Sequence, residues 1–151
     1  MISKVSKVFD YSAIASGIVL FLLAVLTFCD VFGRRFLNSP VTGTIELVEI
    51  GMALVAFLAM PRAFYLNANV SADFINNLNL GILKTYLVIL KFVLMISIMS
   101  LMAYSTTLTS YKFMKNQRVT LDLELYFYPF YVICSIGIWL SVFAIIILFM
   151  K

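Results

Sequence analysis

The chain has 151 residues, of which 64% are hydrophobic and 12% charged, and its formal net charge is +4. A soluble domain carries about 25% charged residues, so this composition excludes a water-soluble surface and indicates an integral membrane protein. The basic residues form no concentrated patch, which argues against a nucleic-acid partner and fits basic membrane flanks.

Uncharged runs predict the segments that cross the membrane. The runs at 11–29, 92–111 and 125–150 each approach or exceed the roughly 20 residues that an α-helix needs to cross the hydrocarbon. A further segment has a shorter uncharged centre at 50–61, but the charged residues at its two ends can reach the headgroups. The pattern lacks the alternation of a β-barrel, so an all-α fold with four transmembrane helices is expected.

The expected helices belong to one domain over residues 1–151, because no linker, repeat or low-complexity tract interrupts the chain. Their predicted bounds are about 7–32, 44–66, 82–111 and 125–150. Lys4 and Lys7 precede the first run as in a signal peptide, but no small-x-small cleavage site follows, so an uncleaved helix is expected. An even number of spans places both termini on one side of the membrane.

Local signals predict where the first two helices end and begin. The first helix is expected to end near Gly33, and Pro40 and Gly43 predict a short turn after it. Thr44 is expected to cap the second helix, which Pro61 should kink or end.

The segment after the second helix, "NANVSADFINNLNLG", is too polar to cross the membrane. Its residues Val70, Phe74, Ile75 and Leu78 nevertheless fall on one face of a helix. This pattern predicts a short amphipathic helix that lies in the membrane interface between the second and third spans.

Small residues mark places where helices can approach closely. Ala13 and Gly17 stand four apart in the first helix, and Gly137 and Ser141 stand four apart in the fourth. Small residues at this spacing let two backbones come together, so these four are candidates for helix packing.

The most polar stretch of the chain surrounds the first turn and contains Asp30, Arg34, Arg35, Glu46 and Glu49. Glu46 and Glu49 share a helix face, and Glu49 lies more than one turn inward, where an unpaired carboxylate is costly. We expect the two glutamates to meet Arg34, Arg35 or a partner protein, with Asp30 as a further candidate for the pairing. The alternative is a set of solvated flank charges, which contribute about 0–1 kcal/mol per exposed pair.

The centres of the predicted helices contain no charged residue. A pump or carrier needs ionisable groups near the bilayer midplane, so this chain is not expected to transport a solute alone. Histidine is absent, which removes the usual ligands of a haem anchor and the commonest general base. Cys29 and Cys134 lie in apolar runs and indicate neither a disulfide nor a metal site. A non-enzyme without a cofactor is expected.

Three segments together resemble one protein family. "DVFGRRFLNSPVTGTIELVEI" is similar to the arginine–aromatic segment, turn and helix start of the small membrane subunit of tripartite ATP-independent periplasmic (TRAP) transporters, the DctQ/SiaQ family. Arg35, Phe36, Glu46 and Leu47 occupy the matching positions. "LDLELYFYPFYVICSIG" resembles the family's entry into the fourth helix.

The third resemblance, "NANVSADFINNL", follows the second helix. Val70 and Asp73 match the family pattern there, whereas Asn69 replaces the usual histidine and Ala72 replaces the usual valine. Asp73, from this resemblance, and Arg62, at the far end of the second helix, are added to the candidates for subunit contacts or structural ion pairs. These candidates are Asp30, Arg34, Arg35, Glu46, Glu49, Arg62 and Asp73.

The resemblance implies a bacterial inner-membrane heterodimer with a large permease subunit of the DctM/SiaM type, supplied by a periplasmic substrate-binding protein. In such sodium symporters the large subunit holds the substrate and sodium sites. The small subunit is expected to widen the fixed scaffold within the membrane lipids and to help dock the binding protein. The substrates implied are organic acids such as sialic acid or C4-dicarboxylates.

The orientation rests on the two N-terminal lysines and on the resemblance, which together imply cytoplasmic N- and C-termini. The 11 lysine and arginine residues divide almost evenly between the two sides and do not decide it.

Two other functions remain open at the level of the sequence. A small homodimeric exporter of drugs or protons needs a membrane-buried carboxylate, for which Asp30 and Glu49 are the candidates. An anchor subunit of a membrane redox enzyme is disfavoured by the missing histidines.

Overall fold

Four long helices make up most of the computed structural model, which describes residues 2–66 and 82–149. The elements are α1 (Ile2–Phe32), the π-helical turn η1 (Gly33–Leu37), α2 (Thr44–Tyr65), α4 (Ile82–Asn116) and α5 (Tyr128–Phe149). All four α-helices are long and apolar enough to cross a membrane. The only strand-like pairing within these ranges is the isolated bridge between Val119 and Tyr126.

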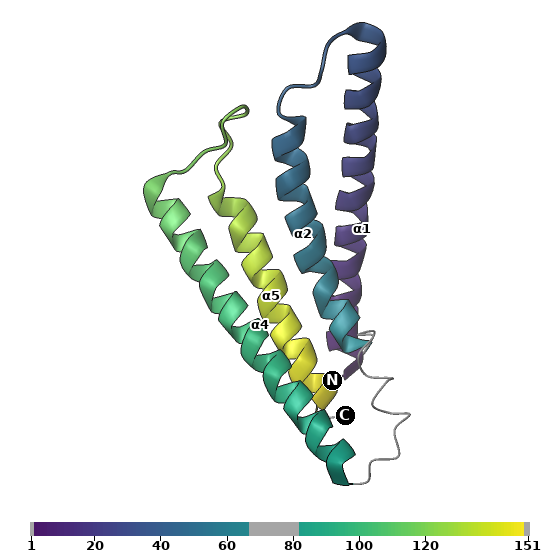
Figure 1. The fold of residues 1–151 in the computed structure, drawn as a ribbon, viewed down its shortest axis with the longest axis vertical. Helices are drawn as coiled ribbons and strands as arrows, with labels where there is room; N and C mark the ends of the chain where they lie inside the picture. Colours follow the sequence, from purple (N-terminus) through teal and green to yellow (C-terminus); the bar gives the residue numbers. More distant parts are fainter. Residues whose placement is uncertain (1, 67–81, 150–151) are drawn as a thin grey trace.

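The helices stand side by side in a layer, in the order α1, α2, α5, α4 (Figure 1). Helix α2 packs against α1 and α5, and α5 packs against α2 and α4, so the last helix of the chain lies inside the layer. In the most apolar stretch of each helix, 44% of residues are buried in α5 but only 11% in α1 and in α4. The outer helices therefore leave most of their apolar side chains for lipid or for another protein.

The layer is closed at one end and open at the other. We call the end that carries the connections 33–43 and 117–127 the turn end, and α1 begins and α5 ends at the opposite end (Figure 1). Near the opposite end, Met99 of α4 and Val142 and Ile145 of α5 form a buried cluster. Met60 and Phe64 of α2 pack against it, so three helices converge there, whereas α2 and α4 diverge toward the turn end.

Close approach of α2 and α5 depends on a glycine. A Cβ atom on Gly137 would lie 2.6 Å from the carbonyl oxygen of Phe57, which is too close for a stable contact. Any larger residue at this position would therefore push the two helices apart. Ser141, one turn further along α5, is completely buried, and its hydroxyl donates to the Gly137 carbonyl at 2.9 Å. This donation lets a polar side chain sit inside an apolar contact.

The contact between α1 and α2 uses serine rather than the predicted glycine. Ser16 is buried and donates its hydroxyl hydrogen to the Val55 carbonyl of α2 at 2.9 Å. Ala13 is partly buried, but Gly17 is exposed, and a Cβ placed on it would meet nothing within 4 Å. Gly17 thus faces away from the α2 contact.

The helix bounds differ from the expected ones at the start of α1, the end of α4 and the start of α5. Helix α1 begins at Ile2 rather than near residue 7. Helix α4 continues past residue 111 to Asn116, because polar residues end a hydrophobic run without ending a helix. It stops before Gln117, whose φ is 45°. Helix α5 begins at Tyr128 rather than near 125, because the preceding residues pair with one another in the connection. The predicted interfacial helix falls within 67–81 and lies outside the described residues.

The turn between α1 and α2 also differs from the expectation. Helical structure passes through Gly33 as a π-turn and ends at Asn38, whose φ of 49° is left-handed, a conformation that asparagine tolerates. Gly43, with φ of 75°, precedes α2 and makes no side-chain cap. Thr44 is the first helical residue, and its hydroxyl donates backward to the Val41 carbonyl at 2.8 Å.

Pro61 lies near the far end of α2 but does not end the helix. The helix continues through it to Tyr65, and the proline ring is completely buried.

Candidate functional site

Three acidic side chains lie at the turn end, and each has different surroundings. Asp30 belongs to α1, and Glu46 and Glu49 belong to the first two turns of α2. The contacts of each carboxylate show which of the three are committed to the fold and which is free to act elsewhere.

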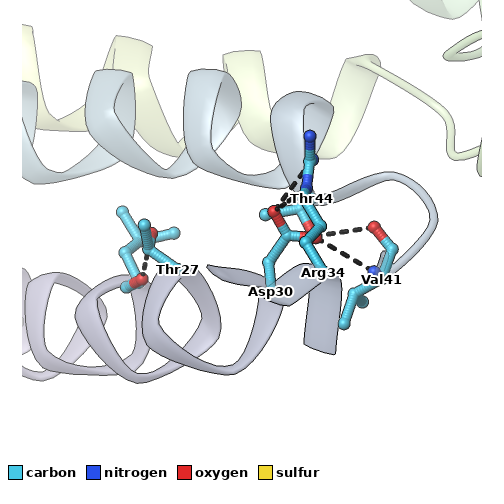
Figure 2. A network of polar contacts seen from close by, with 6 residues as sticks. Thr27, Asp30, Arg34, Val41 and Thr44 are labelled. Carbon is cyan, nitrogen blue, oxygen red and sulfur yellow. Dashed lines mark hydrogen bonds and ion pairs between the residues drawn. The ribbon is translucent and has the colours of Figure 1, made fainter. Parts of the chain in front are cut away.

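Asp30 ties the end of α1 to the following turn (Figure 2). Its Oδ2 accepts a hydrogen bond from Arg34 Nε at 2.9 Å and lies 2.9 Å from Arg34 Nη2, in an i,i+4 ion pair. Its Oδ1 accepts from the Val41 backbone N–H at 2.9 Å. Asp30 is 6% exposed, so both oxygens are used inside the protein. The Thr44 hydroxyl bond to Val41 extends the network to the start of α2.

Glu46 joins the first turn of α2 to the connection 117–127. Its Oε1 accepts from the backbone N–H groups of Leu121 at 2.7 Å and Asp122 at 2.8 Å, and its Oε2 accepts from Leu123 at 3.2 Å. Three successive amides thus surround one carboxylate, an arrangement that stabilises the charge and orders the connection. The Leu123 side chain packs on Gly43, where a Cβ would clash with it.

The connection between α4 and α5 is closed internally as well. Thr120 donates its N–H to the Leu125 carbonyl at 2.9 Å, and Leu125 donates its N–H to the Thr120 hydroxyl at 3.1 Å. Val119 and Tyr126 form the antiparallel bridge beside these bonds. At the tip, the Leu121 side chain is 95% exposed, so an ordered turn presents an apolar side chain outward.

Glu49 lies one turn further along α2 and differs from both. Within the part of the chain that the structure describes, no basic group lies within 4 Å of it, and it has no hydrogen bond. It is exposed and borders two adjoining hollows. One lies between α2 and α5 and the other between α2 and the connection 117–127, and Phe127 lines both.

The arginines do not pair with the glutamates. Arg34 pairs with Asp30 of its own helix, and Arg35 is exposed with no acidic group within 4 Å in residues 2–66 and 82–149. The i,i+4 spacing of Asp30 and Arg34 was visible in the sequence and is the signal that predicts this pair. No comparable signal predicts the partners of Glu46. They are backbone N–H groups far away in the sequence, and every residue type except proline carries such a group.

Arg62 lies near the opposite end, where it pairs with Asp10 of α1 at 2.7 Å. Its guanidinium also lies 5.9 Å from the centre of the Tyr65 ring. Asp10 was not among the expected site residues. Antiparallel neighbours place the start of the first helix beside the end of the second, and this geometry brings the two charges together. Asp73 lies outside the described residues.

A polar contact between α4 and α5 was not expected from the sequence. The hydroxyls of Thr107 and Ser135 are 2.8 Å apart, and Trp139 Nε1 donates to the Thr107 hydroxyl at 3.3 Å. Thr107 also donates to the Ala103 carbonyl at 2.7 Å, so these groups satisfy one another between apolar helices. The described residues hold no group of three or more histidine, cysteine, aspartate or glutamate side chains that could bind a metal ion.

The fold and these contacts define a multi-pass helical membrane protein whose polar groups order the ends of its helices. A family model for the DctQ component of tripartite ATP-independent periplasmic transporters matches residues 23–151, and the chain belongs to this family. Comparisons with curated proteins and with solved structures found no significant match. It is therefore the small, non-catalytic membrane subunit of a TRAP transporter, a family that implies a large permease and a periplasmic binding protein as partners.

Proposed function

We propose that this DctQ subunit is a structural scaffold that packs on a large permease subunit of the DctM/SiaM type and enlarges its fixed part. The observation that carries the proposal is the layer of helices, in which the outer helices leave many large apolar side chains exposed. The helix centres at 18–26, 53–58, 96–102 and 136–146 carry no charge with which to hold an ion or a solute. Such a layer suits a helper subunit that offers surface to another membrane protein.

The turn end is proposed to face the periplasm, with the N- and C-termini in the cytoplasm of a bacterium whose inner membrane holds the complex. The connection 33–43 and the segment 112–124, which includes the last turn of α4, would then be available to the binding protein. Two observations support a docking role: the Asp30 and Glu46 contacts give the connections a fixed form, and Leu121 is an exposed apolar side chain at the tip.

The substrate class follows from the family resemblance alone. Organic acids such as sialic acid or C4-dicarboxylates are proposed as solutes, with the sodium and solute sites in the large subunit. This chain would contribute no cofactor and no solute ligand.

Purification in detergent tests the scaffold role. A tagged chain, co-expressed with the large permease subunit, is expected to bring it down as a stable heterodimer. Reconstituted vesicles should take up solute only when both subunits, the binding protein and a sodium gradient are present. Accumulation of solute by vesicles that contain this chain alone would contradict the proposal and favour a self-sufficient homodimeric exporter.

A further inference from the structure

A groove runs beside Glu49 on the surface of the helix layer. Phe130, Tyr131 and Cys134 of α5 line it together with Ala53 and Phe57 of α2, and Thr106 of α4 borders the far side. We call this surface the Glu49 groove. It has a volume of about 280 Å³ and adjoins a hollow of about 570 Å³ at the turn end.

Glu49 is the acidic side chain that the groove exposes without a partner. Asp30 and Glu46 use both carboxylate oxygens on groups of this chain, whereas Glu49 has no bond to any residue that the structure describes. Arg118 lines the adjoining hollow, but its guanidinium lies over the Phe113 ring, 5.7 Å from the ring centre. A carboxylate beside apolar side chains at the membrane boundary is stable only when a cation or water reaches it.

A second hollow on the layer provides a contrast. It has a volume of about 360 Å³ and lies between α1, α2 and α5, where Leu22, Leu26 and Leu54 are among the side chains that line it. None of its lining residues is charged, so it suits lipid chains or an apolar helix face equally. The carboxylate gives the Glu49 groove a preference for a basic side chain, which this apolar hollow lacks.

We propose that the Glu49 groove receives a helix of the large permease subunit, and that a lysine or arginine of this helix pairs with Glu49. The inference rests on the proposed function and names the chemistry of the contact. A chain at membrane depth must satisfy its backbone internally, so the inserted element is a helix. A helix is about 10–12 Å wide with its side chains, so it lies along the groove and inserts side chains into it.

Charge complementarity selects the occupant. An apolar helix face fills the groove beside Phe57 and Cys134, and a basic side chain at the level of Glu49 neutralises the carboxylate. The pair then fixes the register of one subunit along the other, since sliding the helix by one turn would leave both charges unpaired.

The first experiment measures how much large subunit co-purifies with the tagged full-length chain. Glu49→Gln is expected to lower the recovery about tenfold at a limiting concentration, and Glu49→Lys to lower it further. Glu124→Gln is the matched control, because it neutralises an exposed carboxylate that lines neither hollow and should leave recovery unchanged. Thermal unfolding of each isolated variant should match the wild type, since Glu49 has no partner within the described chain.

The second experiment identifies the contact. A photo-crosslinking amino acid at position 49 is expected to label a membrane helix of the large subunit next to a lysine or arginine. Changing that residue to glutamate should restore the complex with Glu49→Lys. The inference is overturned if the crosslinks go to lipid or a second copy of this chain, or if the exchanged charges fail to restore the complex.

The outcomes separate the two proposals. If the wild-type chain recovers no large subunit, the proposed function fails. If the wild-type complex forms and the Glu49 variants form it equally well, the scaffold role stands and the Glu49 groove is not its docking site.

Discussion

Asp30, Glu46 and Glu49 show that chemically similar side chains in one short stretch of a chain can take different roles. Asp30 is buried and holds Arg34 and the Val41 amide, and Glu46 holds three amides of the other connection. Glu49 holds no described group and faces the groove. Two of the three carboxylates therefore bind groups at the turn end, and the third does not.

Replacement of Asp30 tests the first of these roles. Asp30→Ala removes the acceptor of the Val41 N–H and the ion pair with Arg34, so the midpoint of thermal unfolding in detergent should fall by several degrees. Arg35→Ala removes an exposed, unpaired side chain and serves as the control. Equal midpoints for the two variants would show that the Asp30 network does not stabilise the fold.

Replacement of Glu46 tests the second role through local order. Glu46→Gln removes the charge that three amides share, so hydrogen exchange at Leu121, Asp122 and Leu123 should become about tenfold faster. Glu49→Gln is the control and should leave exchange at these amides unaltered. Unchanged protection in Glu46→Gln would mean that the connection is ordered by its own internal bonds.

The sequence located this polar region, because Asp30, Arg34 and Glu46 flank one turn. The i,i+4 spacing of Asp30 and Arg34 is a signal for their ion pair. The amide partners of Glu46 could not be identified, because they depend on where the connection 117–127 lies in space.

Helix α5 is the element on which the layer depends, because it contacts α2 on one side and α4 on the other. Its buried residues include Gly137, Ile138, Ser141 and Ala144, which are small or aliphatic. The small residues allow close backbone approach, and the aliphatic ones fill the space between turns.

A glycine pair tests this packing. Gly137→Ala forces the Phe57 carbonyl away from α5, and about 1–3 kcal/mol of stability should be lost. Gly17→Ala meets open space and should be neutral or slightly stabilising, by up to about 1 kcal/mol, through helix propensity. Chemical unfolding of the isolated subunit in detergent measures both, and a stable Gly137→Ala variant would show that α2 and α5 can separate without loss.

The sequence was sufficient for the four spans, because long uncharged runs determine them locally. The order α1, α2, α5, α4 could not be predicted in this way. All four helices are apolar on every side, so their hydrophobic pattern does not point to one neighbour, and fits such as that of Gly137 on Phe57 decide it.

The whole molecule is a layer with a closed end and an open end rather than a sealed bundle (Figure 1). Convergence near Met99 and Ile145 holds α2, α4 and α5 together, and divergence toward the turn end exposes the groove. An open layer of apolar helices offers large faces for another membrane protein, in agreement with its family membership.

The turn end provides a test at this scale. Leu121→Asp places a charge on the exposed tip without touching the helix faces, so the complex with the large subunit should form normally. If the tip docks the binding protein, the concentration of binding protein for half-maximal uptake should rise about tenfold. Asp122→Asn, one residue away, is the control, and uptake that is insensitive to Leu121→Asp would place docking elsewhere.

The position of α5 inside the layer has a consequence for biosynthesis. The ribosome makes α1 and α2 first, and these can associate as a hairpin, but it releases α4 before the neighbour against which α4 mainly packs exists. Helix α4 therefore stays without its main packing partner in the bilayer until α5 inserts between it and α2. A nascent chain interrupted before Tyr128 would contain one unassembled span, which makes completion of the last helix the step that commits the subunit to its final shape.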